Sequence, residues 1–443
     1  MKKLFFYRIF ILSLLLMSLS TPAIARTMNI LVYPFENTGD KQYSWISAGM
    51  TETVINDLMG IREVSVISNA DRRKIMEETK FILSGLVAEE TMLKVGKFAG
   101  ANVIFTGSYL VSENSIRVIA RLINVETGKV ESSAKLDGTL EKIFDLQDKV
   151  VLTLLSETGR VSIRDVKRVR IAEADKKKIA EKPRPRTTAY ELYAKGLELR
   201  DTNPKEALAY FKTALDIDKN YVSALIEAGF TAGSTLNLFD EALSYLNRAD
   251  KILKSRKAVK TIDYAELMKN IGNVHNYKGD RDSALRYYTD SQQILDRLGL
   301  QNTVGYARIL NNIGVVYNSK GDLDRALRYL RDSQSTRDRL GLQNTENYAS
   351  TMTNIGNVYG GKGDLDSALR YYTDSQQILD RLGLQNTVGY AGLLFGMGII
   401  YEKRGERGMA GRYYRSSYDT YVRAGYIGPD RDHALSNAQR LGY

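Results

Sequence analysis

Apolar, small and polar residues recur along the second half of this chain with a period of 42 residues. The segment Asn-Ile-Gly stands at 270–272, 312–314 and 354–356, and a diverged fourth copy spans Phe395 to Gly398. Periods of roughly 20 to 50 residues are typical of solenoids and other repeat arrays. The pattern over residues 263–425 therefore predicts four stacked units, each of which is a pair of helices.

Small residues keep step with this period. They are glycine at 272, 314, 356 and 398, and alanine at 284, 326, 368 and 410. Because these residues leave room, we expect the two helices of a unit to approach each other closely there. The larger residues expected to fill the core between repeats are Tyr288, Leu330, Tyr372 and Tyr414. One helix pair cannot bury its apolar face alone, so we expect stacking to stabilise the array.

Part of this recurrence reflects duplication, because residues 282–307 are identical to residues 366–391. The segment Arg297 to Thr303 also recurs, at 339–345 and 381–387, and its glycine is typical of a helix C-cap. Two shorter units precede the long ones, with small residues at 196, 207, 214, 229, 242 and 249. We therefore expect about six repeats over residues 188–429 and a capping helix over residues 430–443.

Residues 26–157 carry a different pattern, in which short β-rich runs alternate with amphipathic stretches. The predicted strands are 28–35, 64–67, 103–111, 115–125 and 129–136, and the predicted helices are 44–59, 71–78, 89–99 and 139–155. Three successive strands joined by short polar turns predict a mixed sheet covered on one face. The fold class is thus a small α/β domain with a mixed sheet, followed by an all-α solenoid.

The first 25 residues have the pattern of a secretory signal peptide. A basic start with Lys2, Lys3 and Arg8 precedes an apolar run, and Ala23 and Ala25 form a cleavage signal. We expect export to the periplasm, and an uncleaved anchor is the alternative. The chain has no cysteine, which excludes disulfides, thiolate metal sites, a cysteine nucleophile and lipid attachment at a cysteine.

Positive charge is concentrated in the segment 158–187, which we interpret as a linker. The whole chain has a net charge of +11, yet the folded parts are nearly neutral, which argues against a nucleic-acid-binding face. The basic segment is either a solvated linker or a contact site for an acidic partner or anionic lipid head groups. Membrane contact is therefore expected to be peripheral at most.

The sequence offers little catalytic chemistry. Of its two histidines, His275 stands where the other long repeats have Tyr317, Tyr359 and Tyr401, so we interpret it as a core substitute. Neither a phosphate-binding loop nor a nucleophile elbow occurs. We expect no enzyme activity, no cofactor and no metal site.

A row of asparagines is the strongest candidate for a binding site. Asn270, Asn312 and Asn354 recur in the first helix of each long repeat, and Asn273 and Asn357 follow one turn later. An asparagine amide both donates and accepts hydrogen bonds, so such a row suits the backbone of an extended peptide. The alternative is that these amides bond neighbouring repeats. Phe395 interrupts the row in the fourth unit.

Both the repeat array and the amino-terminal domain resemble known protein families. The repeat pattern, with its recurrent glycines, alanines and tyrosines, resembles tetratricopeptide repeats, and the 42-residue spacing is similar to that of kinesin light chains and related adaptors. In those adaptors the matching asparagines contact bound peptide, and the resemblance carries that role to Asn270, Asn312 and Asn354. No other role is implied by it.

The amino-terminal domain resembles that of TolB-type periplasmic proteins and the related curli-assembly lipoprotein family. The resemblance lies in residues 30–37, 47–52 and 100–108, although the lipidation cysteine of the curli-type proteins is absent. We therefore expect an exported periplasmic scaffold or adaptor that binds a protein or peptide on the concave face of its repeats. The alternative is an envelope assembly or secretion component that forms a homo-oligomer through the α/β domain.

Overall fold

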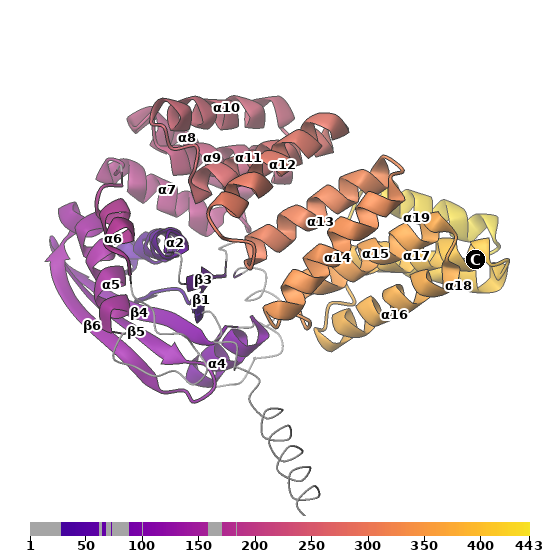
Figure 1. Ribbon diagram of the computed structural model, residues 1–443, viewed down its shortest axis with the longest axis horizontal. Helices are drawn as coiled ribbons and strands as arrows, with labels where there is room; N and C mark the ends of the chain where they lie inside the picture. The colour runs from indigo at the N-terminus through magenta and orange to yellow at the C-terminus, as the bar shows by residue number, and fades with distance from the viewer. Residues whose placement is uncertain are drawn as a thin grey trace, which may run out of the picture.

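The computed structural model of this chain describes residues 28–61, 64–67, 72, 88–99, 101–157, 171–182 and 184–443. The expected signal peptide and nearly all of the expected helix at 71–78 lie outside these residues. Two parts follow one another in the described chain, a sheet with its helices and a long array of helix pairs (Figure 1).

The sheet is mixed, as the sequence predicts. Its strands are β1 (Met28–Val32), β2 (Glu36–Asn37), β3 (Val64–Val66), β4 (Val103–Ser112), β5 (Ser115–Asn124) and β6 (Val130–Thr139). The strand order is β3-β1-β4-β5-β6, and the short β2 also pairs with β4. The pairs β1–β3, β1–β4 and β2–β4 are parallel, whereas β4–β5 and β5–β6 form antiparallel hairpins. The turn Glu113–Asn114 joins β4 to β5 and sets the register of that hairpin, with Ser112 opposite Ser115.

Helices lie on both faces of the sheet, so the expectation of a single covered face was wrong. Helices α2 (Trp45–Met59) and α5 (Ile143–Glu157) pack on one face, whereas α4 (Ala88–Phe98) packs on the other. Leu31 and Ile104 point toward α4, where they pack with Val95. Successive side chains of a strand alternate between faces, and β1 is apolar at nearly every position, so its parallel region needs cover on both sides.

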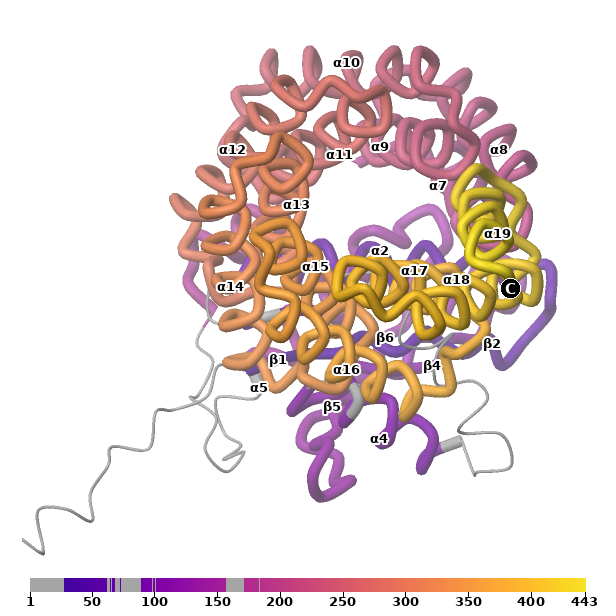
Figure 2. The backbone as a smooth tube through the Cα atoms, turned by 90° about the vertical axis from the view of Figure 1, so that its right-hand side faces the viewer, coloured from indigo at the N-terminus to yellow at the C-terminus, as the bar shows by residue number. Residues whose placement is uncertain are grey.

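The rest of the described chain is helical. After the short α6 (Glu173–Ala180), the pairs are α7 (Thr187–Leu199) with α8 (Pro204–Ile217), α9 (Val222–Phe230) with α10 (Phe239–Ser255), α11 (Ile262–Tyr277) with α12 (Arg281–Arg297), α13 (Val304–Ser319) with α14 (Leu323–Arg339), α15 (Glu346–Lys362) with α16 (Leu365–Arg381), and α17 (Val388–Lys403) with α18 (Arg407–Arg423). Helix α19 (Pro429–Arg440) packs on α18 at the carboxyl end. The repeats stack into a curved array whose first helices, such as α11, α13 and α15, lie on the inside (Figure 2).

The glycine row confirms the predicted close approach of the paired helices. A Cβ atom built on Gly272, Gly314 or Gly356 would lie 2.7 Å from the side chain of Tyr288, Leu330 or Tyr372, respectively. Gly398 has the same relation to Tyr414. The facing alanines are fully buried. A buried serine of each second helix donates a hydrogen bond to a backbone carbonyl of the first, as Ser375 does to Ala349 (2.8 Å).

Helix ends follow the repeat as well. Thr303 and Thr345 accept N-cap hydrogen bonds at the start of α13 and α15, and Asp322 caps α14 by accepting from the Arg325 amide (3.1 Å). Gly299, Gly341 and Gly383 have φ of 71° to 73° after the second helices. Only glycine adopts this backbone region without strain, which confirms their role as C-caps.

The sheet and the array share one apolar core. A single cluster of buried side chains extends from β1 through α2 and α5 into α7 and onward to α13. At the joint, Tyr190 of α7 packs edge-on against Trp45 and Phe144, with ring centroids 5.9 and 4.8 Å apart. Its hydroxyl accepts a hydrogen bond from Gln147 Nε2 (2.7 Å). The first repeat is therefore built directly onto the α/β domain (Figure 1).

Candidate binding groove and domain junction

The inner face of the array changes in chemical character along its length. The residues at corresponding positions on α11, α13, α15 and α17 are Glu266, Arg308, Ser350 and Gly392 in one row, and Asn273, Val315, Asn357 and Ile399 in the next. The inner face, which we call the inner groove, thus begins with charged and amide groups at α11 and ends with apolar ones at α17. The side chains of Ser350, Asn357 and Ile399 are exposed, and Ile399 has 37% of its surface accessible to solvent.

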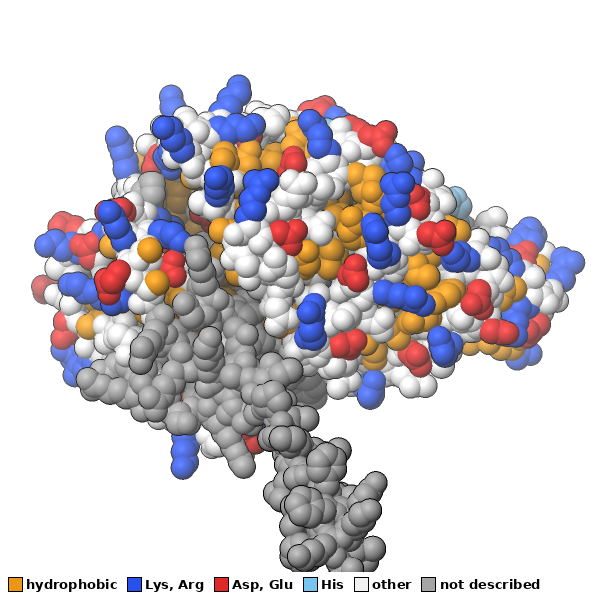
Figure 3. Space-filling model, viewed as in Figure 1, with side chains coloured by type: hydrophobic (Ala, Val, Ile, Leu, Met, Phe, Trp, Pro, Cys, Tyr) orange, Lys and Arg blue, Asp and Glu red, His pale blue; other side chains and the backbone are white. Residues whose placement is uncertain are grey.

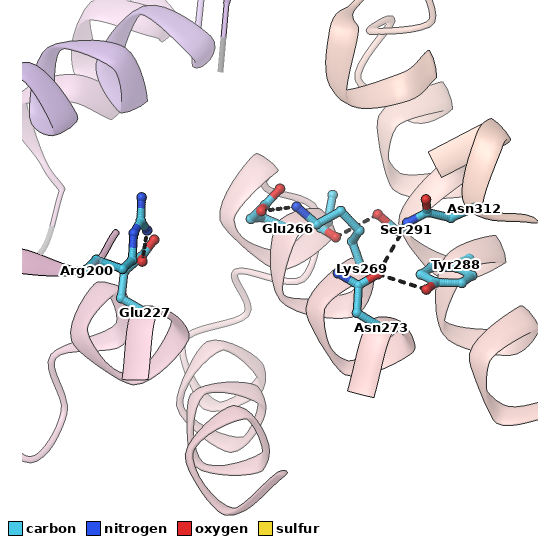
Figure 4. A network of polar contacts seen from close by, with 9 residues as sticks. Arg200, Glu227, Glu266, Lys269, Asn273, Tyr288, Ser291 and Asn312 are labelled. Carbon is cyan, nitrogen blue, oxygen red and sulfur yellow. Dashed lines mark hydrogen bonds and ion pairs between the residues drawn. The ribbon is translucent and has the colours of Figure 1, made fainter. Parts of the chain in front are cut away.

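Two of the predicted asparagines bond to each other across neighbouring repeats. Asn273 Oδ1 accepts hydrogen bonds from the Tyr288 hydroxyl (2.8 Å) and from Asn312 Nδ2 (3.2 Å) (Figure 4). Asn273 therefore joins the two helices of its own repeat and also the first helix of the next.

The same kind of contact recurs one repeat later with a shifted partner. Asn354 Nδ2 donates to Asn311 Oδ1 (3.1 Å), and Asn357 Oδ1 accepts from the Tyr372 hydroxyl (2.6 Å). Asn311 is a binding partner that the sequence reasoning missed, although it directly precedes Asn312. These bonds show that the alternative, bonding between repeats, operates in this array.

The five asparagines differ in what they can still offer a ligand. Asn357 is exposed, and Asn273, Asn312 and Asn354 are half-buried. Asn270 is only 4% exposed, and its Oδ1 accepts no hydrogen bond within the described part of the chain. Peptide contact by these amides remains a prediction.

The fourth unit ends the row with a glycine. Gly396, rather than Phe395, stands at the position that matches Asn354. A Cβ atom on Gly396 would lie 2.9 Å from the Tyr372 hydroxyl, so no larger residue fits without a shift. Phe395 is half-buried and packs against Tyr414, with ring centroids 5.3 Å apart.

Buried charges gather where the groove meets the α/β domain. Arg200, at the end of α7, forms an ion pair with Glu227 of α9 and is 3% exposed (Figure 4). Glu52 of α2 lies nearby, and its burial raises the pKa of its carboxyl to about 7, assisted by the charge of Glu227 and opposed by that of Arg200. These residues come from helices far apart in sequence and outside the 42-residue period, so no sequence signal identified them.

The basic segment before the repeats packs on the domain in its described part. Lys182 Nζ lies 3.1 Å from Asp57 Oδ1, and Asp57 is buried. Lys178 pairs with Asp175 (2.9 Å), and Arg184 pairs with Asp148 (2.7 Å) and also with Asp145. These cations are therefore partnered within the chain, which leaves fewer of them for an acidic partner or for lipid head groups.

Stacked aromatic pairs mark one edge of the array. Tyr317 stacks on Tyr329, and Tyr359 on Tyr371, with interplanar angles of 13° and 17°. His275 stacks on Tyr287 in the same way, at a centroid distance of 5.4 Å. His275 thus occupies the tyrosine position, as predicted, and its Nδ1 lies 3.0 Å from Asp280 Oδ2.

An ion pair links each long repeat to the one before it. The pairs are Lys278 with Asp240, Lys320 with Asp282, Lys362 with Asp324 and Arg404 with Asp366. Each joins the end of a first helix to the start of the preceding second helix, 38 residues earlier. Acidic and basic side chains are interspersed over the repeats on the face in Figure 3.

No group of three or more histidine, aspartate or glutamate side chains in the described part of the chain could hold a metal ion. No helix among the same residues is long and apolar enough to cross a membrane.

A family model for the tetratricopeptide repeat matches residues 263–339 and, one repeat later, residues 305–381. The helical array therefore contains tetratricopeptide repeats. This agrees with the helix pairs, the small residues at their crossings and the stacking described above. Tetratricopeptide arrays are scaffolds of the solenoid class, in which each repeat contacts mainly its neighbours.

Individual relatives are distant. A protein of Rhizobium meliloti (strain 1021) named putative adenylate cyclase 3 is 24% identical over 208 residues, which is 46% of this chain and 32% of that protein. The chain thus matches about a third of the length of this curated relative.

Two solved structures match part of this chain at low identity. The Cut9–Hcn1 hetero-tetramer of APC/C matches with a TM-score of 0.45 and 17% identity over 60% of this chain and 44% of that one. BtubC from P. vanneervenii matches with a TM-score of 0.41 and 18% identity over 55% of this chain and 91% of that one.

Proposed function

We propose that this protein is an exported scaffold that binds an extended segment of a protein partner along the inner face of its tetratricopeptide repeats. The observation that carries the proposal is the graded inner face, which runs from Glu266 through Asn357 to Ile399. The curvature of a repeat array creates an extended concave surface of the kind that solenoid proteins use for binding.

The change from charged and amide groups to apolar groups along the inner face indicates what kind of partner it would bind. Amides in the middle of the groove suit the backbone of an extended segment, because each can donate and accept hydrogen bonds. The apolar end at Ile399, which is exposed on α17, suits an apolar side chain. The partner segment therefore has polar residues over α13 and α15 and an apolar residue over α17. We assign no catalytic role to this surface.

Selection from a displayed library of random peptides tests this function on the full chain. We expect enriched peptides to share an apolar residue, and Ile399→Asp to abolish their binding. Thr373→Asp is the matched control, because Thr373 is exposed on the outer helix α16, and it should bind normally. Equal binding by both variants, or peptides without a shared apolar residue, would contradict the proposal.

Export is the second part of the proposal, and it is supported by the basic and apolar pattern of the first 25 residues and by the resemblance of residues 26–157 to TolB-type domains. Expression of the full-length chain in a Gram-negative host tests it. The protein should appear in the periplasmic fraction with Arg26 as its first residue. Retention in the cytoplasm with Met1 in place would refute it.

The alternative role, assembly through the α/β domain, finds less support. The last strand of the described sheet is β6, which carries Glu131, Lys135 and Asp137. Charged side chains on an outer strand discourage pairing with a second copy. Sedimentation of the full chain at high concentration distinguishes the two, since a scaffold of this kind needs no self-association.

A further inference from the structure

A cleft of about 470 Å³ lies where the α/β domain, the basic segment and the first three repeats meet. It is bounded by the end of α2, by α6 and by the starts of α9 and α11. Much of its wall is apolar, from Met59, Ile179, Leu253, Ile262, Leu298 and Leu300. Clefts of this size at a junction between domains are typical of small-molecule sites.

One carboxylate in this wall has an unused acceptor. Asp57 accepts from Lys182 Nζ through Oδ1 (3.1 Å), but its buried Oδ2 accepts no hydrogen bond within the described chain. The side chain of Asp57 is 1% exposed. Burial raises the pKa of this carboxyl, the charge and hydrogen bond of Lys182 oppose that rise, and the nearby charge of Asp263 adds to it. A buried acceptor without a donor is costly unless a donor arrives from elsewhere.

The charges around this carboxylate favour a cation. Asp263 also lines the cleft and is exposed, and it has no ion pair among the described residues. Burial lowers the pKa of the Lys182 ammonium group, but the charges of Asp57 and Asp263 outweigh burial and raise that pKa. The other inner cations are already partnered, Lys178 by Asp175 and Arg184 by Asp148 and Asp145.

Two further basic residues stand at the edge of the cleft. Arg256 donates to the backbone carbonyl of Asn220 (3.4 Å), and Lys260 is exposed. Because both are on the surface, their charges are screened by water and salt more strongly than the charge of Asp57. Within the described chain, Asp57 Oδ2 is therefore the buried acceptor left for a ligand, and Asp263 adds a second carboxylate nearer the surface.

We propose that this cleft binds a small organic cation with an apolar body, whose ammonium group meets Asp57 and Asp263 while the body packs on Leu253, Ile262 and Leu300. Such a ligand touches the α/β domain and the repeats at the same time. The ligand therefore stabilises the joint between the α/β domain and the repeats, because a ligand that binds only the folded state raises the stability of that state. The site is separate from the inner groove, and its test does not depend on the partner of that groove.

Calorimetric titration of the full chain with phenethylamine and with 3-phenylpropionate tests the proposal. The two probes share an aromatic body and carry opposite charges. We expect phenethylamine to bind, to raise the melting temperature and to have at least about a tenfold higher affinity than 3-phenylpropionate, the ratio that corresponds to about 1.4 kcal/mol. Absence of phenethylamine binding at millimolar concentration, or equal affinity for both probes, would overturn the proposal.

Two variants locate the binding. Asp263→Asn should weaken phenethylamine binding severalfold, because it removes the charge of a carboxylate that lines the cleft and keeps the size of the side chain. Asp216→Asn is the matched control, since Asp216 is exposed on α8 and does not line the cleft. Ala258→Trp, which fills part of the cleft, should abolish binding. Unchanged affinity in both Asp263→Asn and Ala258→Trp would place the probe elsewhere and refute the site.

Discussion

Gly49 of α2 and Tyr190 of α7 are in contact across the joint between the sheet and the repeats. A Cβ atom on Gly49 would lie 2.6 Å from the Tyr190 hydroxyl oxygen and 3.0 Å from the Cβ of Ala194. The tyrosine is 1% exposed and is held by Gln147, so it has no free space into which to move. The absence of a side chain at Gly49 is what lets the two helices meet.

Replacement of Gly49 by alanine should therefore destabilise the whole protein. Overpacking of a well-filled core typically costs about 1–3 kcal/mol, and we expect a loss of that size in the free energy of unfolding measured with urea. Gly305→Ala is the control. Gly305 lies in α13, and its added Cβ would meet nothing closer than 4.0 Å, so the better helix former should raise stability by up to about 1 kcal/mol. Equal effects at the two glycines would contradict this account of the joint.

The carboxyl of Glu52 should make stability depend on pH. Its folded-state pKa of about 7 lies above the ordinary 4.5, so the folded state holds the proton more tightly than the unfolded state does. The stability that Glu52 contributes is therefore complete below about pH 4.5 and is lost as the pH rises through 7, by an amount on the order of 1–3 kcal/mol. Burial raises the pKa of Asp148, to about 6, in the same direction.

Glu52→Gln isolates this contribution. Thermal unfolding at pH 5 and pH 8 should show a smaller loss of stability in the variant than in the wild type, because glutamine does not titrate. Part of the loss should persist, since Asp148 still titrates. Identical losses in the two proteins would mean that Glu52 is not the group responsible.

The asparagine row should be energetically uneven. Asn273→Ala leaves the hydroxyl of buried Tyr288 without its acceptor and removes the partner of Asn312, which should cost about 1–3 kcal/mol of unfolding free energy. Asn354→Ala leaves only the half-buried Asn311 without a donor, which water can replace, and should cost less than about 1 kcal/mol. Urea unfolding of the two variants compares them directly. A larger cost at Asn354 would contradict the hydrogen bonds described.

The ion pairs between repeats should contribute little individually. Asp324 is 89% exposed where it pairs with Lys362, and exposed pairs are typically worth about 0.2–1 kcal/mol. Asp324→Lys should therefore lower the melting temperature slightly, and the loss should shrink in high salt. The exchange of both residues, Asp324→Lys with Lys362→Asp, should restore the wild-type value. A loss that salt does not affect would indicate a steric cause instead.

The repeat architecture could be predicted because the residues that shape each repeat recur at the same positions in the sequence. A glycine and a larger residue recur at the same spacing in every long repeat, as Gly314 and Leu330 do, so spacing alone indicates that they touch. The C-cap glycines and the aspartate caps follow from local chemistry. The position of His275 could be inferred in the same way, because three tyrosines stand at the matching positions.

The joint and its cleft could not be predicted, because they depend on pairs of residues that occur once. Gly49 and Tyr190 lie 141 positions apart, and neither belongs to a repeated pattern. Lys182 reads as one of many charges in a linker until the fold brings it to Asp57. The second covered face of the sheet was missed for a related reason, since the burial of β1 is decided by where α4 packs.

Because the apolar core continues across the joint, the first repeat of the array is covered more extensively than the last. A stack of repeats needs each terminal repeat covered, and here the α/β domain covers the first and the single helix α19 covers the last. Opening from the amino-terminal side would expose the sheet's own core along with the repeat, whereas opening from α17 to α19 exposes one small interface. Loss of hydrogen-exchange protection should therefore spread from the carboxyl end toward the sheet, and the inner groove should lose its apolar end before its charged one.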